Sequence, residues 1–278
     1  TLFIHTHEKT FVTNNPYNSK EGKVRTMKII LTHDVDSINK PFKHIWARRK
    51  RFGARDLILA ALKLKNIYNN IEDVIAKEDE YGFKSTFFVP TNLFNLLEII
   101  DVLKRLVKDG WEVQLHYVYE SIQPEGLFVM QKEFFEKYLG KVLGVRTHML
   151  MINEKLIKLF KKEGLIYDSS YRIETVRRYD PFLIDENFIE IPIGIMDADM
   201  FGRLKLGEKD AWKYILWKTR KAEEEKAEYF TILFHQESYR MKGGRLYKDL
   251  LKFLAEKGYK SMRCIDTVNS LSDSRMHF

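Results

Sequence analysis

Two aspartates separated by a single residue are the first candidates for chemistry in this chain. Asp34 and Asp36 come directly after a short β-rich run, 28–32. Two carboxylates at this spacing can divide the work where the chain has left regular strand geometry, because one can bind a metal ion while the other takes a proton. The residue types alone leave open which aspartate has which role.

Other Asp and His residues also fall at the ends of predicted strands or directly after them. They are His116, His148, Asp168, Asp197 and His235. Each alone has an ordinary structural explanation, as a core histidine, a helix cap or a turn residue. In a parallel α/β barrel, however, the carboxyl ends of the strands converge on the face that carries the active site. We therefore expect these residues to share one polar site.

The available ligands favour a metal site of carboxylates and imidazoles. Cys264 is the only cysteine, which excludes a site built from several thiolates. Oxygen and nitrogen ligands suit Zn²⁺ first, with Co²⁺, Mn²⁺ or Fe²⁺ as alternatives, and a catalytic ion needs about three protein ligands and an open position. Such an ion acidifies water and polarises a carbonyl, and His235 can protonate a departing amine. The set predicts metal-assisted hydrolysis of an amide or ester.

Short β-rich runs alternate with longer helical patterns, which predicts a parallel sheet. The predicted strands are 28–32, 85–89, 111–116, 144–148, 165–168, 188–193, 229–235 and 259–262. The predicted helices are 92–108, 127–139, 153–162, 209–228 and 246–257. We expect an α/β fold over 27–278, a single distorted (β/α) barrel with seven to eight parallel strands. An amino-terminal arm or extension is expected over 1–26, and a helical insertion at about 40–81, which is longer than one crossover needs.

Composition narrows the class of protein. With 45% hydrophobic residues the chain can bury a core, yet no apolar run is long enough to span a membrane. A single cysteine fits an intracellular, cytoplasmic setting. The net charge of +8 is densest at 48–51, where a solvated helix face is the default and nucleic-acid or membrane contact the alternative. Abundant Lys and Glu with only four Gln are typical of hyperthermophile proteins.

Several motifs, taken in order, resemble those of the polysaccharide deacetylases of carbohydrate esterase family 4, the NodB-like deacetylases. The resemblance runs from about 28 to 268, and the matching segments are 32–36, 84–89, 112–116, Arg146, 191–197 and 233–235. It implies that Asp34 is the general base, that Asp36 is a metal ligand and that His116 is the first metal histidine. The other roles that it implies are Arg146 as the residue that orients the base, Asp197 as the residue that tunes the last histidine, and His235 as the general acid.

Two positions depart from the family pattern. The second histidine of the usual His-x-x-x-His motif is replaced by Glu120, and the segment after Arg146 reads Thr-His-Met instead of x-Pro-Tyr. One histidine is lost and another is gained, so we expect the metal to be held by Asp36, His116 and His148. The alternatives are Glu120 as the third ligand, or no third protein ligand.

The resemblance implies a metal-dependent hydrolase that removes N- or O-acetyl groups from a carbohydrate by cleaving an amide or ester bond. One alternative is an amidohydrolase that acts on a small non-sugar amide. Another is a catalytically inactive barrel with a sugar-binding or regulatory role, which the altered motifs make credible. The expected partner is a carbohydrate or another small acetylated substrate, with no nucleic acid. The oligomeric state does not follow from the sequence.

Overall fold

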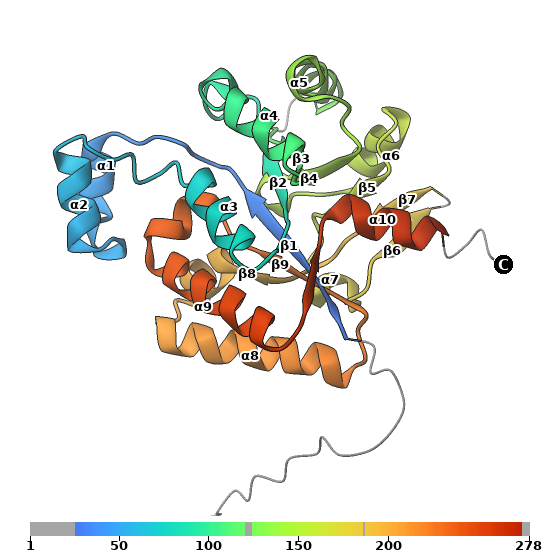
Figure 1. The fold of residues 1–278 in the computed structure, drawn as a ribbon. Coiled ribbons are helices and arrows are strands. Elements are labelled where there is room, and N and C mark those ends of the chain that lie inside the picture. The colour runs from blue at the N-terminus through green and yellow to red at the C-terminus, as the bar shows by residue number, and fades with distance from the viewer. Residues whose placement is uncertain (1–25, 120–123, 186, 274–278) are drawn as a thin grey trace, which may run out of the picture.

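A curled sheet surrounded by helices forms the molecule (Figure 1). The computed structural model describes residues 26–119, 124–185 and 187–273. The strands are β1 (Lys28–Asp34), β2 (Thr86–Val89), β3 (Glu112–Tyr117), β4 (Gly144–Thr147), β5 (Tyr167–Asp168), β6 (Phe182–Asp185), β7 (Phe188–Glu190), β8 (Ile193–Met196), β9 (Tyr229–Leu233) and β10 (Lys260–Met262). The α-helices are α1 (Phe42–Ala47), α2 (Ala54–Ala61), α3 (Ile71–Asp79), α4 (Ile100–Lys108), α5 (Pro124–Leu139), α6 (Glu154–Lys162), α7 (Ile173–Val176), α8 (Glu208–Glu224), α9 (Lys242–Glu256) and α10 (Cys264–Asp273).

The sheet order is β6-β7-β5-β4-β3-β2-β1-β9-β8, and every neighbouring pair is parallel except β6 with β7. The amino-terminal half of β1 also pairs with β10. This curled parallel sheet with helices between its strands confirms the expected (β/α) barrel. Because the strands run in one direction, their carboxyl ends share one edge of the barrel.

The predicted strand 188–193 is in fact two strands, and the break brings the ends of the curled sheet together. Its first part, β7, pairs with β5 at one end of the sheet, whereas β8 pairs with β9 at the other end. Between them lies Pro192, which has no N–H to donate to a ladder. The chain therefore crosses from one end of the sheet to the other at this proline. Directly after it, the Ile193 N–H donates a hydrogen bond to Tyr171 O at 2.8 Å.

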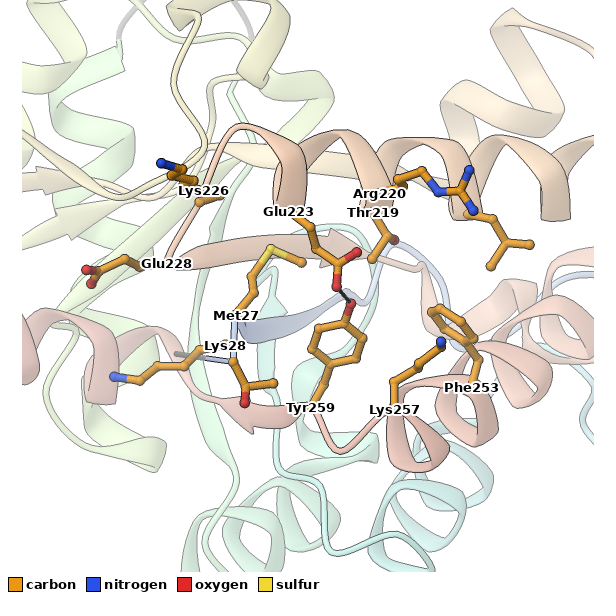
Figure 2. Close-up of a pocket in the computed structure, with 13 residues that line it drawn as sticks. Met27, Lys28, Thr219, Arg220, Glu223, Lys226, Glu228, Phe253, Lys257 and Tyr259 are labelled. Atoms are coloured by element: carbon orange, nitrogen blue, oxygen red, sulfur yellow. Dashed lines mark hydrogen bonds between the residues drawn. The ribbon is translucent and has the colours of Figure 1, made fainter. Parts of the chain in front are cut away.

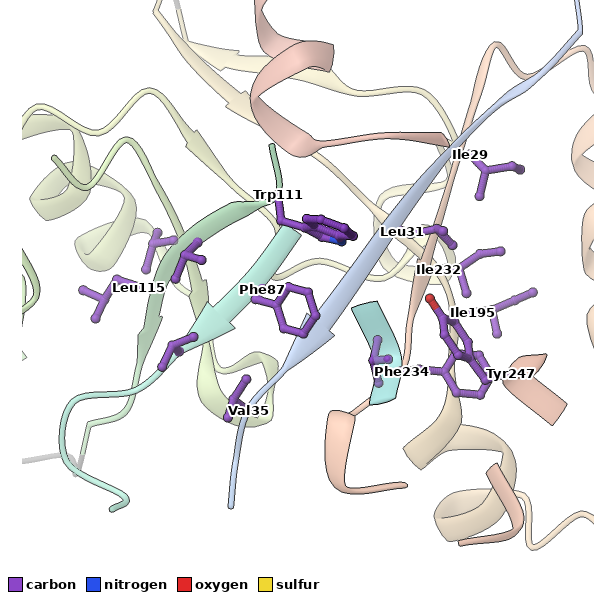
Figure 3. Close-up of a cluster of buried hydrophobic side chains, with 14 of the residues drawn as sticks. Ile29, Leu31, Val35, Phe87, Trp111, Leu115, Ile195, Ile232, Phe234 and Tyr247 are labelled. Atoms are coloured by element: carbon purple, nitrogen blue, oxygen red, sulfur yellow. The ribbon is translucent and has the colours of Figure 1, made fainter. Parts of the chain in front are cut away.

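Side chains of β1 alternate between the two faces of the sheet, as a period of two requires. Ile29 and Leu31 join a large apolar cluster, part of which Figure 3 shows. The cluster also includes Leu103 of α4 and Leu250 of α9. Ile30 joins a second cluster on the other face, with residues of α10. The same alternation sends Thr32 and Asp34 to the face of Ile30.

Residues 40–81 contain α1, a short 3₁₀ helix (Arg49–Arg51), α2 and α3. Helix α3 is joined to the barrel through Glu78, whose side chain is fully buried. Its carboxylate accepts hydrogen bonds from Ser85 Oγ and Trp111 Nε1 at 2.7 Å each and from Tyr247 at 2.6 Å, and lies 2.8 Å from His33 Nε2. Helices α1 and α2 project from one side of the molecule (Figure 1).

Helix α6 shows how local sequence sets an element next to the site. The Asn153 side chain accepts a hydrogen bond from the Leu156 N–H at 3.1 Å, which caps the amino terminus of the helix. Leu156 and Phe160, one turn apart, are both buried. Gly164 has a φ of +80°, a left-handed conformation that ends the helix.

Within the part of the chain that the structure describes, no helix has the length and apolar character of a membrane span.

Candidate active site

The two aspartates at the end of β1 have different surroundings. Asp34 is the last residue of the strand and is buried, whereas Asp36 lies two residues beyond it and is partly exposed. The Val35 N–H still donates to Phe88 O at 3.0 Å, so the ladder with β2 holds the chain up to this point. The two carboxylates are therefore fixed by the same ladder but reach different partners.

Asp36, His116 and His148 come together at the carboxyl ends of β1, β3 and β4. His116 Nε2 lies 3.2 Å from Asp36 Oδ1 and 3.3 Å from His148 Nδ1, and His148 Nδ1 lies 3.5 Å from Asp36 Oδ1. One ligand atom from each residue thus lies within 4.8 Å of the other two. The two histidines come from neighbouring positions in the sheet, because His116 lies in β3, which pairs with β4, and His148 directly follows β4.

His148 does not end a strand as predicted, since β4 stops at Thr147 and His148 begins a 3₁₀ turn, His148–Leu150. Met149 and Leu150 have φ values of 57° and 55°. Left-handed backbone costs an ordinary residue about 1–2 kcal/mol. Within this tight turn Leu150 packs against Ile193, Met196 and Leu233 of β8 and β9, while His148 remains half-buried beside the ligand cluster.

The donor set fits a divalent cation. Asp36 Oδ1 is buried and accepts no hydrogen bond of normal geometry among the described residues, although two imidazole nitrogens face it. Burial alone would raise the pKa of Asp36, but His116 and His148 outweigh burial and lower it well below the usual value. An ionised carboxylate with two imidazoles is a ligand set typical of Zn²⁺ and similar ions. His116 Nδ1, on the far side of its ring, is buried without a described hydrogen-bond partner.

Arg146 fixes the first aspartate. Its guanidinium is completely buried and donates to Asp34 Oδ1 and Thr32 Oγ1 at 3.0 Å each. Its other nitrogens donate to the carbonyl and hydroxyl oxygens of Ser169 at 2.7 and 2.6 Å, and the group lies over the Phe88 ring. With Oδ1 held in this way, Asp34 Oδ2 lies 3.8 Å from His116 Nε2, on the side of the ligand cluster.

His235 and Asp197 form a second pair beside the cluster. Asp197 is buried, and its Oδ1 lies 2.6 Å from His235 Nδ1 while its Oδ2 accepts from the His235 backbone N–H at 3.1 Å. Burial would lower the pKa of His235, but the charge and hydrogen bond of Asp197 outweigh burial and hold it well above its usual value. The other ring nitrogen, Nε2, lies 3.6 Å from Asp36 Oδ2.

Asp168, which we expected in the shared polar site, lies apart from it. Its carboxyl is completely buried, accepts a hydrogen bond from Ser170 Oγ at 2.6 Å and interacts with the buried carboxyl of Glu190. Burial raises the pKa of Asp168 to about 6, and burial together with the charge of Asp168 raises the pKa of Glu190 well above its usual value. The two buried carboxyls can share one proton, so this expectation was wrong and the pair belongs to the interior of the barrel.

Two residues near the site were not singled out from the sequence. Ser169 supplies two acceptors to Arg146, but a serine after a predicted strand carries no recognisable signal. Glu237 interacts electrostatically with the site, and burial, opposed by His235 and assisted by Asp36, raises its pKa to about 8. Its position two residues after His235 was an available signal. Glu120, the alternative third ligand, and residues 1–25 of the expected arm lie outside the described residues.

A pocket of about 920 Å³ lies at the opposite end of the barrel (Figure 2). Met27 and Lys28, at the amino-terminal start of β1, line it together with residues of α8 and α9. None of the clustered His and Asp residues reaches it, so the pocket is separate from the candidate site.

Comparisons with known proteins agree with this architecture at the level of the fold. No protein-family profile matches the chain. No curated protein matches it in sequence. Among solved structures it is similar to a protein from Mycobacterium smegmatis assigned as a polysaccharide deacetylase, with 16% identity, a TM-score of 0.65 and 96% of each chain covered.

Two further structures share the arrangement. Puue allantoinase is 12% identical with a TM-score of 0.64, over 94% of this chain and 97% of that one. BA3943 from Bacillus anthracis, a pseudoenzyme of carbohydrate esterase family 4, is 12% identical with a TM-score of 0.54, over 87% of this chain and 66% of that one. The chain therefore has the fold of the polysaccharide deacetylases, as its sequence motifs indicate.

Proposed function

We propose that the chain is a metal-dependent hydrolase that removes acetyl groups from a carbohydrate. The observation that carries this proposal is the convergence of three sets of residues on one edge of the barrel. They are the cluster Asp36, His116 and His148, the pair Asp34 and Arg146, and the pair His235 and Asp197. Hydrolysis of an amide or ester needs a base, an acid and a means to stabilise negative charge on the carbonyl oxygen.

Asp36, His116 and His148 are the residues that would hold the metal. A divalent ion bound there supplies Lewis-acid chemistry, because it acidifies water and polarises a carbonyl oxygen. Asp34 is placed to act as the base, since Arg146 holds its Oδ1 and leaves Oδ2 on the side of the cluster. The guanidinium of Arg146 also keeps the Asp34 side chain in one rotamer, so Asp34 Oδ2 does not have to move before it accepts a proton.

His235 is placed to act as the acid. Asp197 binds its Nδ1, which leaves Nε2 facing the cluster with a proton to give. The charge and hydrogen bond of Asp197 raise the pKa of His235, which favours the protonated ring. Water adds its oxygen to the carbonyl carbon while Asp34 takes a proton from the water. When that carbon then loses its bond to nitrogen or oxygen, the proton of His235 goes to the leaving group, and the products are acetate and a free amine or hydroxyl.

The test is release of acetate by the purified chain from acetylated oligosaccharides. The protein is stripped with a chelator and then reloaded with Zn²⁺, Co²⁺, Mn²⁺ or Fe²⁺. Acetate release that disappears on chelation and returns with a metal supports the proposal. A chain that binds metal but hydrolyses none of a panel of N- and O-acetylated sugars contradicts it.

A second candidate function is hydrolysis of a small non-sugar amide. It is favoured by the likeness to Puue allantoinase, whose TM-score of 0.64 is close to that of the deacetylase. Adding allantoin and related small amides to the same panel separates the two. The inactive, sugar-binding alternative predicts glycan binding without turnover and without a requirement for metal.

A further inference from the structure

The excess of positive over negative charge in this protein is concentrated in one segment. Residues 40–65, which include α1 and α2, contain nine Lys or Arg and one acidic residue, Asp56. The resulting charge of +8 equals the net charge of the whole chain, so the remaining residues are balanced. An excess this local produces a positive potential on one side of the molecule.

The basic side chains of this segment are available to an outside partner. Seven of them are exposed and form no ion pair within the described ranges. They are Lys43, Arg48, Arg49, Lys50, Arg51, Arg55 and Lys63. Its single acid is already engaged, because Asp56 binds Arg240 at 3.2 Å. The segment therefore presents uncompensated positive charge to solvent.

The same segment exposes large apolar side chains. Trp46 is 54% exposed, Ile58 60%, Leu62 62% and Leu64 70%, and Phe42 is also exposed. Exposed Arg55 and Ile58 of α2 and exposed Leu62, which caps its carboxyl end, follow one another at helical spacing, so charge and apolar surface share one face. Single exposed apolar residues are common, but five within one short basic segment form a patch that needs a partner.

The segment is anchored firmly and at the end of the barrel that carries the site. Phe52 pairs with Met241 through a backbone bridge, and Ile45, Phe52, Ile67 and Tyr68 form a small buried core. It follows the carboxyl end of β1 and packs on residues that follow the carboxyl end of β9. Figure 1 shows α1 and α2 outside the helices that cover the sheet.

We propose that residues 40–65 bind the surface of a lipid bilayer that contains anionic phospholipid. Lys and Arg are attracted to anionic headgroups, while Trp, Leu and Ile enter the boundary between headgroups and acyl chains. A soluble polyanion such as a nucleic acid would use the positive charge but leaves the exposed Ile and Leu unexplained. The bilayer accounts for both properties of the segment, and it would lie next to the end of the barrel that carries the candidate site.

The test is co-sedimentation of the full chain with vesicles of phosphatidylcholine alone or of equal parts phosphatidylcholine and phosphatidylglycerol. We expect binding to the anionic vesicles only. Lys50→Gln with Arg55→Gln should weaken binding about fivefold per charge removed. The matched control, Lys104→Gln with Lys108→Gln on α4, removes two exposed lysines elsewhere and should bind like the unmodified protein.

An apolar pair of variants distinguishes a bilayer from a soluble polyanion. Trp46→Ser with Leu62→Ser should weaken vesicle binding by about tenfold. The matched control changes Leu97 and Trp217, which are 46% and 55% exposed outside the segment, to Ser and should have no effect. Absence of binding to anionic vesicles overturns the proposal, and so does equal loss in variants and controls. Full binding by the apolar variant, with competition by a single-stranded oligonucleotide, overturns it in favour of a polyanion site.

Discussion

The Arg146 guanidinium donates a hydrogen bond to Asp34 Oδ1 at 3.0 Å, and neither side chain has more than marginal contact with solvent. Removing one partner of such a buried pair leaves an uncompensated charge and costs about 3–5 kcal/mol. The pair therefore fixes the position of one carboxylate oxygen and directs the other toward His116. This arrangement gives Asp34 a role distinct from that of Asp36.

Asp34→Asn should retain bound metal and lose turnover by about 10²–10⁴-fold, because an amide of the same shape cannot accept the proton. Metal content and acetate release are measured on the same preparation. Asp109→Asn, an exposed position at the end of α4, is the control. Loss of metal from Asp34→Asn together with retention in Asp36→Asn would reverse the two roles.

Replacement of Asp36 or His116 by Ala should remove the metal. An open site with three protein ligands loses most of its affinity for the metal when any one ligand is removed. We expect the metal affinity to fall by more than about 100-fold, which exceeds the loss caused by removing a residue that only hydrogen-bonds to a ligand. Bound metal after dialysis is the readout. His44→Ala, which changes a histidine of α1 outside the cluster, should keep a full complement of metal. Near-stoichiometric metal in both site variants would reject the assignment.

His148→Ala tests whether the histidine at this position has taken the place of the family's second metal histidine. We expect lost metal and an altered visible spectrum of the Co²⁺-loaded protein, because a nitrogen ligand leaves the shell. Glu120→Gln, made in parallel, should leave the spectrum unchanged. The reverse pattern, with the spectrum sensitive to Glu120 and indifferent to His148, would give Glu120 the ligand position.

Asp197→Asn should shift the pH dependence of kcat/KM. An acid works only while protonated, so activity falls as pH rises through the pKa of His235. Asp197 keeps that pKa raised in spite of burial. Removal of its charge therefore lowers the pKa and moves the alkaline limb to lower pH. Asp210→Asn, on the surface of α8, should leave the profile in place. An unchanged alkaline limb in Asp197→Asn would separate His235 from the acid step.

Glu78→Gln should lower the free energy of unfolding by about 3 kcal/mol, because an amide cannot accept all the hydrogen bonds that the buried carboxylate receives. Denaturant unfolding followed by circular dichroism measures this. Glu80→Gln is the matched control, since Glu80 is exposed and pairs with Lys77. Equal stability of the two variants would show that α3 is held by apolar packing alone.

The sequence predicted the barrel because most of its strands have a β-rich run, and because a candidate polar residue lies at or just after the carboxyl ends of β1, β3, β4, β5, β8 and β9. It did not predict the short strand β6. It also did not predict that 188–193 is divided between two strands. Pro192 signals an interruption of the run, but only three-dimensional pairing shows that the parts before and after it bind different strands. Asp168 was misplaced for a related reason. A strand-end aspartate has the same sequence pattern whether it reaches the site or a buried partner such as Glu190.

Because β1 pairs with β9, the first strand of the sheet gains its neighbour on that side only late in synthesis. Thr32 of β1 donates to Ile232 of β9 across 200 residues of sequence. A nascent chain that has emerged only through α8 already carries Asp36, His116 and His148, but one edge of β1 has no strand beside it. Open strand edges recruit other chains, so this intermediate is exposed to aggregation on the ribosome. Emergence of β9 supplies the missing strand and His235 together, so closure of the sheet and assembly of the site coincide in time.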